Sequence, residues 1–312
     1  MGALARPVLL VNRPAEEFLR QWPLSLKGDV EGIHQARVAT RRLREALPLL
    51  ARSDRDREPA WIRSALRSLT RALGPSRELD VSRIVLAEIV RRTPVHAAAA
   101  AATDRRLAVE RAAAATVLVQ IGLGLDVAAL IGRTRELAIR LGGEPGTSGC
   151  ARRAGARLQG RADALRAAVL AAGRVYAPGP LHGVRISLKT FRYAFELAGR
   201  LSRGRHGATL RRLKTLQDIL GDMHDLQVLA AQVRDAGAWL AARQQPALEA
   251  LALHLDDQIR DLHSRYVTKR VLLTAVVARA TRLARALAAR QPPGEPVTRR
   301  QRATGTARGR RR

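Results

Sequence analysis

Two blocks of this sequence occur twice, and the copies of each block are 147 or 148 residues apart. The first block carries one histidine and three basic residues at the same spacing in both copies: His34, Arg37, Arg41 and Arg44, then His182, Arg185, Lys189 and Arg192. The second block runs from Leu73-Gly74 to Val81 and again from Leu220-Gly221 to Val228. Two blocks in one order indicate a duplicated half of roughly 130–150 residues, too long to be the unit of a short-period solenoid.

Almost everything between residues 14 and 290 has the composition of helices. These segments are rich in Ala, Leu, Arg and Glu, and they lack the alternation of β-branched residues that is typical of strands. Helix breakers recur at intervals suited to helices of roughly 15–25 residues. They include Gly74-Pro75-Ser76 and Gly221-Asp222 in the second block. At both places we expect one helix to end and the next to begin in a tight turn.

The composition divides the chain into five predicted segments. They are an N-terminal leader (1–13), a first helical half (14–141), a Gly/Pro/Ser-rich linker (142–150), a second helical half (151–290) and a disordered Arg-rich tail (291–312). The tail holds seven arginines against one acidic residue and has no apolar period. Such a segment cannot bury enough apolar surface to fold alone.

The net charge of +29 points to a polyanionic partner. The chain has 56 basic residues against 27 acidic ones, and only four of the basic residues are lysines. Arginine stays charged and binds oxyanions through two parallel hydrogen bonds. Nucleic acid, an anionic membrane surface and inorganic polyphosphate all remain open on charge alone.

The apolar runs, the N-terminus and the cysteine content of the sequence bear on its location in the cell. No run of 18 apolar residues occurs, so we expect no transmembrane span, and no signal peptide is recognisable. The single Cys150 forbids an internal disulfide and a cysteine-based zinc site. We expect a cytoplasmic protein.

The first block places its cations on one face of a helix. His34, Arg37, Arg41 and Arg44 are spaced at i, i+3, i+7 and i+10, and their counterparts have the same spacing. An apolar stripe lies beside each set: Ile33, Ala36, Leu43, Leu47 and Leu50, then Val184, Leu188, Phe191 and Phe195. A solvated helix face would explain one such stripe. Its repetition, with few acids apart from Glu45 and Glu196, favours a surface that binds repeated oxyanions.

These blocks resemble those of the CHAD family, the conserved-histidine α-helical domain. The resemblance rests on the strings that begin at His34 and His182 and on the string from Leu216 to Leu226, and it covers about residues 14–290. It implies two pseudo-symmetric helical bundles with basic residues around a central channel, and binding of inorganic polyphosphate without catalysis. By this resemblance the ligand contacts come from His34, Arg37, Arg41, Arg42, Arg44, His182, Arg185, Lys189 and Arg192.

Three other functions compete with this interpretation. His206, His224-Asp225 and Asp256-Asp257 could be fitted to a helical metal phosphohydrolase, although the duplicated turn already accounts for His224-Asp225. A nucleic-acid-binding protein would use the same arginines on a phosphate backbone, helped by the tail. An interaction protein on polyphosphate or storage granules would use polyphosphate only as an anchor.

The sequence therefore predicts an all-α protein of two pseudo-symmetric, antiparallel bundles of the four-helix type, with a basic groove between them. Its predicted function is non-catalytic binding of linear polyphosphate, with no catalytic residue, metal or cofactor. Two further pairs of basic residues, on the helices that lead into the second block, complete the predicted site: Arg63 and Arg67, then Arg211 and Lys214. Oxyanions beside His34 and His182 would favour the charged form of both histidines.

Overall fold

All regular structure in the described part of the chain is helical, which confirms the predicted all-α class. The computed structural model describes residues 8–50, 57–141, 144–202, 204–237 and 244–289. The first half contains α1 (Val8–Leu26), α2 (Val30–Leu50), α3 (Arg57–Arg92), the 3₁₀ turn η1 (Pro94–His96), α4 (Ala97–Leu123) and α5 (Val127–Leu141). The second half contains α6 (Glu144–Ala172), α7 (Pro178–Ser202), α8 (Gly207–Gly237), α9 (Gln245–Lys269) and α10 (Leu272–Ala288).

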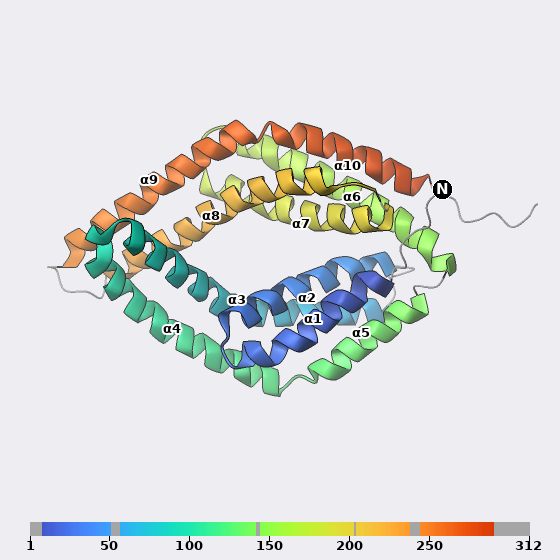
Figure 1. The fold of residues 1–312 in the computed structure, drawn as a ribbon, viewed down its shortest axis with the longest axis horizontal. Helices are drawn as coiled ribbons and strands as arrows, with labels where there is room; N and C mark the ends of the chain where they lie inside the picture. The colour runs from blue at the N-terminus through green and yellow to red at the C-terminus, as the bar shows by residue number, and fades with distance from the viewer. Residues whose placement is uncertain (1–7, 51–56, 142–143, 203, 238–243, 290–312) are drawn as a thin grey trace, which may run out of the picture.

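The two halves lie on opposite sides of the long axis of the molecule (Figure 1). In the interior, α3 packs against α8, and α2 packs against both α6 and α7. The outer edge of one half is formed by α4 and α5, and that of the other by α9 and α10 (Figure 1). Within each half the last helix returns to the first, because α5 packs on α1 and α10 packs on α6. Among the described residues each half thus has five α-helices, where the sequence predicts a bundle of the four-helix type.

The helices of the second half follow the order of the first at the spacing of the repeated blocks. α2 begins at Val30 and α7 at Pro178, while α4 begins at Ala97 and α9 at Gln245. Both intervals are 148 residues (178 − 30 and 245 − 97). This spacing supports the duplication, which stays a prediction.

Helices α2 and α7 form as their apolar periods predict. All residues named for the two apolar stripes are buried, from Ile33 to Leu50 on α2 and from Val184 to Phe195 on α7. A short turn precedes α2, with Gly28 at a φ of 82°, a conformation that glycine adopts without steric cost. The carboxylate of Asp29 then accepts a hydrogen bond from the Gly32 amide at 2.6 Å and so caps the helix.

The predicted turns in the second block are wrong. Helix α3 continues through Gly74-Pro75, and helix α8 continues through Gly221-Asp222. Among the described glycines only Gly28 and Gly173 have positive φ. Pro75 removes one backbone donor, a cost that packing on both sides of it overcomes, because Leu73 and Leu79 are both buried.

Several predicted boundaries fall inside helices. Helix α1 begins at Val8, within the predicted leader, and the predicted linker 142–150 is helical from Glu144 onward. The predicted tail 291–312 lies outside the described residues. The helices α1 and α6 therefore begin earlier in the sequence than predicted.

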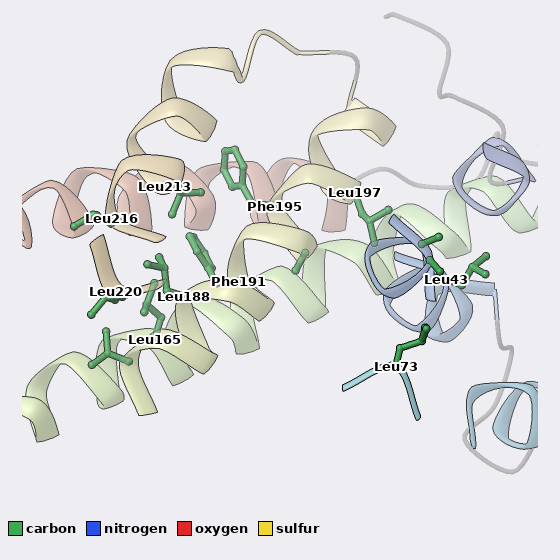
Figure 2. Close-up of a cluster of buried hydrophobic side chains, with 14 of the residues drawn as sticks. Leu43, Leu73, Leu165, Leu188, Phe191, Phe195, Leu197, Leu213, Leu216 and Leu220 are labelled. Atoms are coloured by element: carbon green, nitrogen blue, oxygen red, sulfur yellow. The ribbon is translucent and has the colours of Figure 1, made fainter. Parts of the chain in front are cut away.

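A continuous core of buried apolar side chains joins both halves. Figure 2 shows part of it, with leucines of α6 and α8 around the two phenylalanines of α7: Leu165, Leu213, Leu216, Leu220, Phe191 and Phe195. Leu43 of α2 and Leu73 of α3 belong to the same core. This packing fixes the rotation of α2, α3, α7 and α8, and therefore the direction in which their polar faces point.

Helix α4 exposes several large apolar side chains. Val109, Val117 and Leu123 are 71%, 58% and 77% exposed. No single described helix is long and apolar enough to cross a membrane; Pro94–Leu123 and Val127–Leu141 meet that standard only when counted as one pair, bent by 63°.

Candidate anion-binding cleft

A cleft of about 590 Å³ lies between the two halves, and helices α2, α3, α7 and α8 line it. At least half of its 24 lining residues form pairs that are 147 or 148 positions apart. These pairs include His34 with His182, Arg37 with Arg185, Arg41 with Lys189, Arg77 with His224, Glu78 with Asp225, and Gly74 with Gly221. The repeated blocks therefore converge on one space, with positive charge on both walls.

Arg37 is held by the backbone of α3. Its Nη1 donates a hydrogen bond of 2.7 Å to the backbone oxygen of Thr70. A Cβ atom at Gly74 would lie 3.1 Å from the same Nη1. Gly74 therefore does not form a turn. Because it has no side chain, it lets the Arg37 guanidinium approach the backbone of α3 closely. Burial and the nearby charge of Arg41 lower the pKa of Arg37 to about 10, so it remains protonated at neutral pH.

The other central cations have no hydrogen-bond or ion-pair partner in the described part of the protein. Arg41, Arg77, Arg185 and Lys189 are half-buried, and within the described ranges none of them makes a side-chain hydrogen bond or an ion pair. Burial lowers the pKa of Arg185 and lowers that of Lys189 to about 7. Their unused N–H donors are available to an anion in the cleft.

Carboxylates in the cleft compensate part of this charge, more than the sequence predicts. Five line it: Glu45, Glu78, Asp218, Asp222 and Asp225. Two are already engaged, since Glu45 lies 2.7 Å from Arg157 and Asp218 lies 2.6 Å from Lys214. Burial raises the pKa of Asp222 and Asp225. Six arginines and lysines line the same cleft and outnumber the five carboxylates.

Two histidines of the cleft, His34 and His224, have pKa values below the ordinary value of a histidine. The rings of His182 and His224 are 5.3 Å apart. Burial, followed by the charge of Arg185, lowers the pKa of His224 to about 4. Burial, followed by the charge of Arg77, also lowers the pKa of His34. The charged form predicted for His34 would therefore require an anion beside it.

Comparison with known proteins agrees with this geometry. The sequence profile of the CHAD domain matches residues 11–234, which is more than half of the chain. The chain belongs to the CHAD family. This family is linked in general to polyphosphate binding. The profile covers α2, α3, α7 and all but the last three residues of α8, and α9 and α10 follow the matched range.

Two solved structures share the CHAD fold with this chain. PptA from Streptomyces chartreusis is 21% identical with a TM-score of 0.62, over 84% of this chain and 97% of its own. The CHAD domain from the plant Ricinus communis is 23% identical with a TM-score of 0.55, over 94% of this chain and 96% of its own. No curated protein sequence matches this chain.

The cleft between the two halves contains seven of the thirteen predicted site residues: His34, Arg37, Arg41, Arg44, His182, Arg185 and Lys189. The other six lie outside it. Arg42 lies 3.9 Å from Glu196, and the guanidinium of Arg192 lies 5.3 Å from the ring centre of Tyr193. Lys214 pairs with Asp218. Arg63, Arg67 and Arg211 are exposed, and the first two are close enough to Arg44 to lower its pKa.

Two residues of the cleft, Arg77 and His224, were not among the predicted anion-binding residues. Both belong to the second repeated block, where they are 147 residues apart. The repeat was the available signal, but the expected turns at Gly74 and Gly221 concealed it. Once α3 and α8 continue through these glycines, the residues one helical turn later face the same cleft.

The residues proposed for a metal phosphohydrolase are not assembled. Asp256 pairs with Arg234, Asp257 pairs with Arg260, and His206 shares a hydrogen bond of 2.8 Å with Ser202. Within the described ranges of this CHAD protein, no three His, Cys, Asp or Glu side chains gather in a way that could hold a metal ion.

Proposed function

We propose that this protein binds inorganic polyphosphate in the cleft between its halves and does not transform it. The observation that carries the proposal concerns cations from two distant segments, Arg41 and Arg77 in the first half and Arg185 and Lys189 in the second. They line one cleft without a hydrogen-bond or ion-pair partner among the described residues. Unpaired, half-buried guanidinium groups are costly in a free protein. An anion that supplies their missing hydrogen bonds would offset this cost, and each charge-assisted contact contributes about 1.5–3 kcal/mol.

The shape of the site supports a linear anion. The cations stand on facing walls, so a thin chain of oxyanions could contact both halves at once. A longer chain would gain affinity by presenting many equivalent groups to the same arginines. The exposed Arg63 and Arg67 beside Arg44 would bind the part of the polyphosphate that extends out of the cleft.

Nucleic acid fits the cleft less well. Single-stranded nucleic acid is bound largely by stacking bases on aromatic side chains. Apart from histidines, the described lining of the cleft has one aromatic residue, Tyr193, and only 7% of its surface is exposed. A double helix presents its phosphates on a convex surface, which half-buried cations on the walls of a cleft cannot follow.

The test is to replace two cleft cations that have no protein partner. We expect Arg41→Gln combined with Arg185→Gln to weaken polyphosphate binding by about two orders of magnitude or more, because two charge-assisted contacts are lost. The free energy of unfolding should not fall, since both substitutions relieve repulsion. Calorimetric titration measures the affinity, and urea denaturation measures the stability.

A matched control has the same change in net charge outside the cleft. Arg282 and Arg285 are exposed on α10, so Arg282→Gln with Arg285→Gln should retain nearly all the affinity. Equal losses in both double variants would contradict the assignment of the site. Competition at fixed salt decides between ligands: if excess DNA displaces polyphosphate while short polyphosphate fails to displace DNA, the protein is a nucleic-acid binder.

A further inference from the structure

Lysine is rare in this chain, and one lysine lies in the middle of the cleft. The chain has 52 arginines and four lysines, and of the lysines only Lys189 is among the residues that line the cleft. The matched position in the first half is Arg41. A guanidinium keeps its proton at any physiological pH, whereas an amine can release it when its surroundings disfavour charge. This single difference makes one cation of the cleft titratable.

The arginines around Lys189 disfavour its charge. Arg37 and Arg41 approach from α2, and Arg185 lies on the same helix, α7. The remaining charged or titratable groups of the cleft lining are His34, Arg44 and Glu45 of α2, Arg77 and Glu78 of α3, His182 and Tyr193 of α7, and Asp218, Asp222, His224 and Asp225 of α8. The Lys189 amine makes no hydrogen bond or ion pair with any described residue.

Burial and the neighbouring charges act in the same direction on this amine. Burial is the largest cause, followed by Arg41, Arg185 and Arg37, and together they lower the pKa of Lys189 to about 7. Asp225 raises this pKa, but it does not offset the other causes. Lys189 in the empty cleft is therefore a mixture of ammonium and neutral amine near neutral pH.

We propose that polyphosphate binding in this cleft is coupled to the uptake of a proton by the Lys189 amine. The inference rests on the proposed function, because the bound anion supplies the negative charge that favours the ammonium form. The proton comes from the solvent and no covalent bond to phosphorus forms. The ammonium then donates its three N–H groups to phosphate oxygens.

The coupling fixes the sign of the pH dependence. Below about pH 7 Lys189 already carries its proton, and binding takes up little. Above about pH 7 the free cleft has lost this proton, so binding must restore it and the affinity falls as the pH rises. From pH 7.0 to about pH 8.5 we expect roughly a tenfold loss of affinity.

The experiment compares the wild-type protein with Lys189→Arg, which keeps a permanent cation in the same place. Each is titrated calorimetrically with long-chain sodium polyphosphate at about pH 7.5, in two buffers that differ in ionisation enthalpy. We expect the wild-type protein to take up roughly 0.5–1 proton more than Lys189→Arg, and we expect Lys189→Arg to lose most of the pH dependence above pH 7. The end groups of the chain titrate near pH 6 and contribute equally to both proteins.

Lys269→Arg provides the matched control, because Lys269 is exposed at the end of α9 and should leave the proton uptake unchanged. Equal proton uptake by the wild-type protein and Lys189→Arg would overturn the inference while leaving the proposed function intact. Absence of polyphosphate binding by both proteins at every pH would overturn the proposed function itself, and this inference with it. Proton uptake lost equally in Lys269→Arg would also contradict the assignment to Lys189.

Discussion

Arg37 and Arg185 occupy equivalent positions in the two halves, yet their contacts differ. Arg37 lies against Gly74 and donates to the Thr70 backbone oxygen, whereas Arg185 makes no hydrogen bond to any described residue. A Cβ atom at Gly221, the counterpart of Gly74, would meet nothing within 4 Å. The first wall of the cleft is thus preorganised by its own backbone, and the second wall leaves its guanidinium free to adjust to a ligand.

This difference predicts opposite outcomes for two glycine substitutions. Gly221→Ala should raise the free energy of unfolding by about 0.5–1 kcal/mol, because alanine is the better residue within a helix. Gly74→Ala should be less stable than Gly221→Ala by about 1 kcal/mol, because its Cβ displaces Arg37 from the Thr70 oxygen. Urea denaturation of both variants measures the difference. Equal stabilisation by the two alanines would show that Arg37 moves without losing this contact.

At the scale of helices, a buried ion pair fixes α4 to α3. Arg111 Nε lies 2.6 Å from Asp80 Oδ1, and the two side chains are only 10% and 5% exposed. Arg111 also donates a hydrogen bond of 3.0 Å to the backbone oxygen of Gly28, in the turn between α1 and α2. One side chain therefore connects three elements of the first half and holds α3 in the orientation that turns Arg77 toward the cleft.

Removal of one partner from this pair should destabilise the fold strongly. Arg111→Ala leaves the Asp80 carboxylate buried and uncompensated, and we expect a loss of about 3–5 kcal/mol in the free energy of unfolding. Arg83 and Asp104 form a second ion pair between the same two helices, with 2.7 Å between Arg83 Nε and Asp104 Oδ1. Both of these side chains are about 40% exposed. Arg83→Ala should therefore cost no more than about 1 kcal/mol. Chemical denaturation that gives similar losses for both variants would contradict the role assigned to burial.

At the scale of the whole molecule, two separate parts of the chain could attract a polyanion. The cleft gathers cations from both halves of the fold, while the segment 291–312 adds seven arginines beyond the described residues. Both would attract polyanions over long range, and the cleft places its charges on two facing walls. Long-range attraction is screened by salt, whereas contacts within a half-buried site are screened much less.

Removal of residues 291–312 therefore tests which of the two parts matters. We expect the shortened protein to bind polyphosphate with only mildly reduced affinity and with a smaller dependence on salt, because fewer counterions are exchanged. Titrations at several salt concentrations measure both quantities. Complete loss of affinity would place the binding site in this segment and would leave the cleft without a role.

Much of this architecture follows from local sequence patterns. On α2 and on α7, a period of 3.6 residues separates the apolar stripe from the cationic stripe. This alone predicts that Ile33 and Phe191 are buried and that Arg37 and Arg185 each lie on the polar face of their own helix. The repeat predicts that both halves contribute equivalent residues. The continuity of α3 and α8 was not predictable in this way, because packing along each helix overcomes the local effect of Gly74-Pro75 and Gly221.

The sequence by itself determined the helical class, the two cationic stripes and their equivalence, since these depend on the spacing of residues along one helix. Only the tertiary structure decided which cations meet in the cleft. It placed Arg77 and His224 there, paired Glu45 with Arg157 of the other half, and left Arg192 beside Tyr193. The physical reason is that burial and charge pairing depend on neighbours that are distant in the sequence, and the packing of α2, α3, α7 and α8 alone brings those neighbours together.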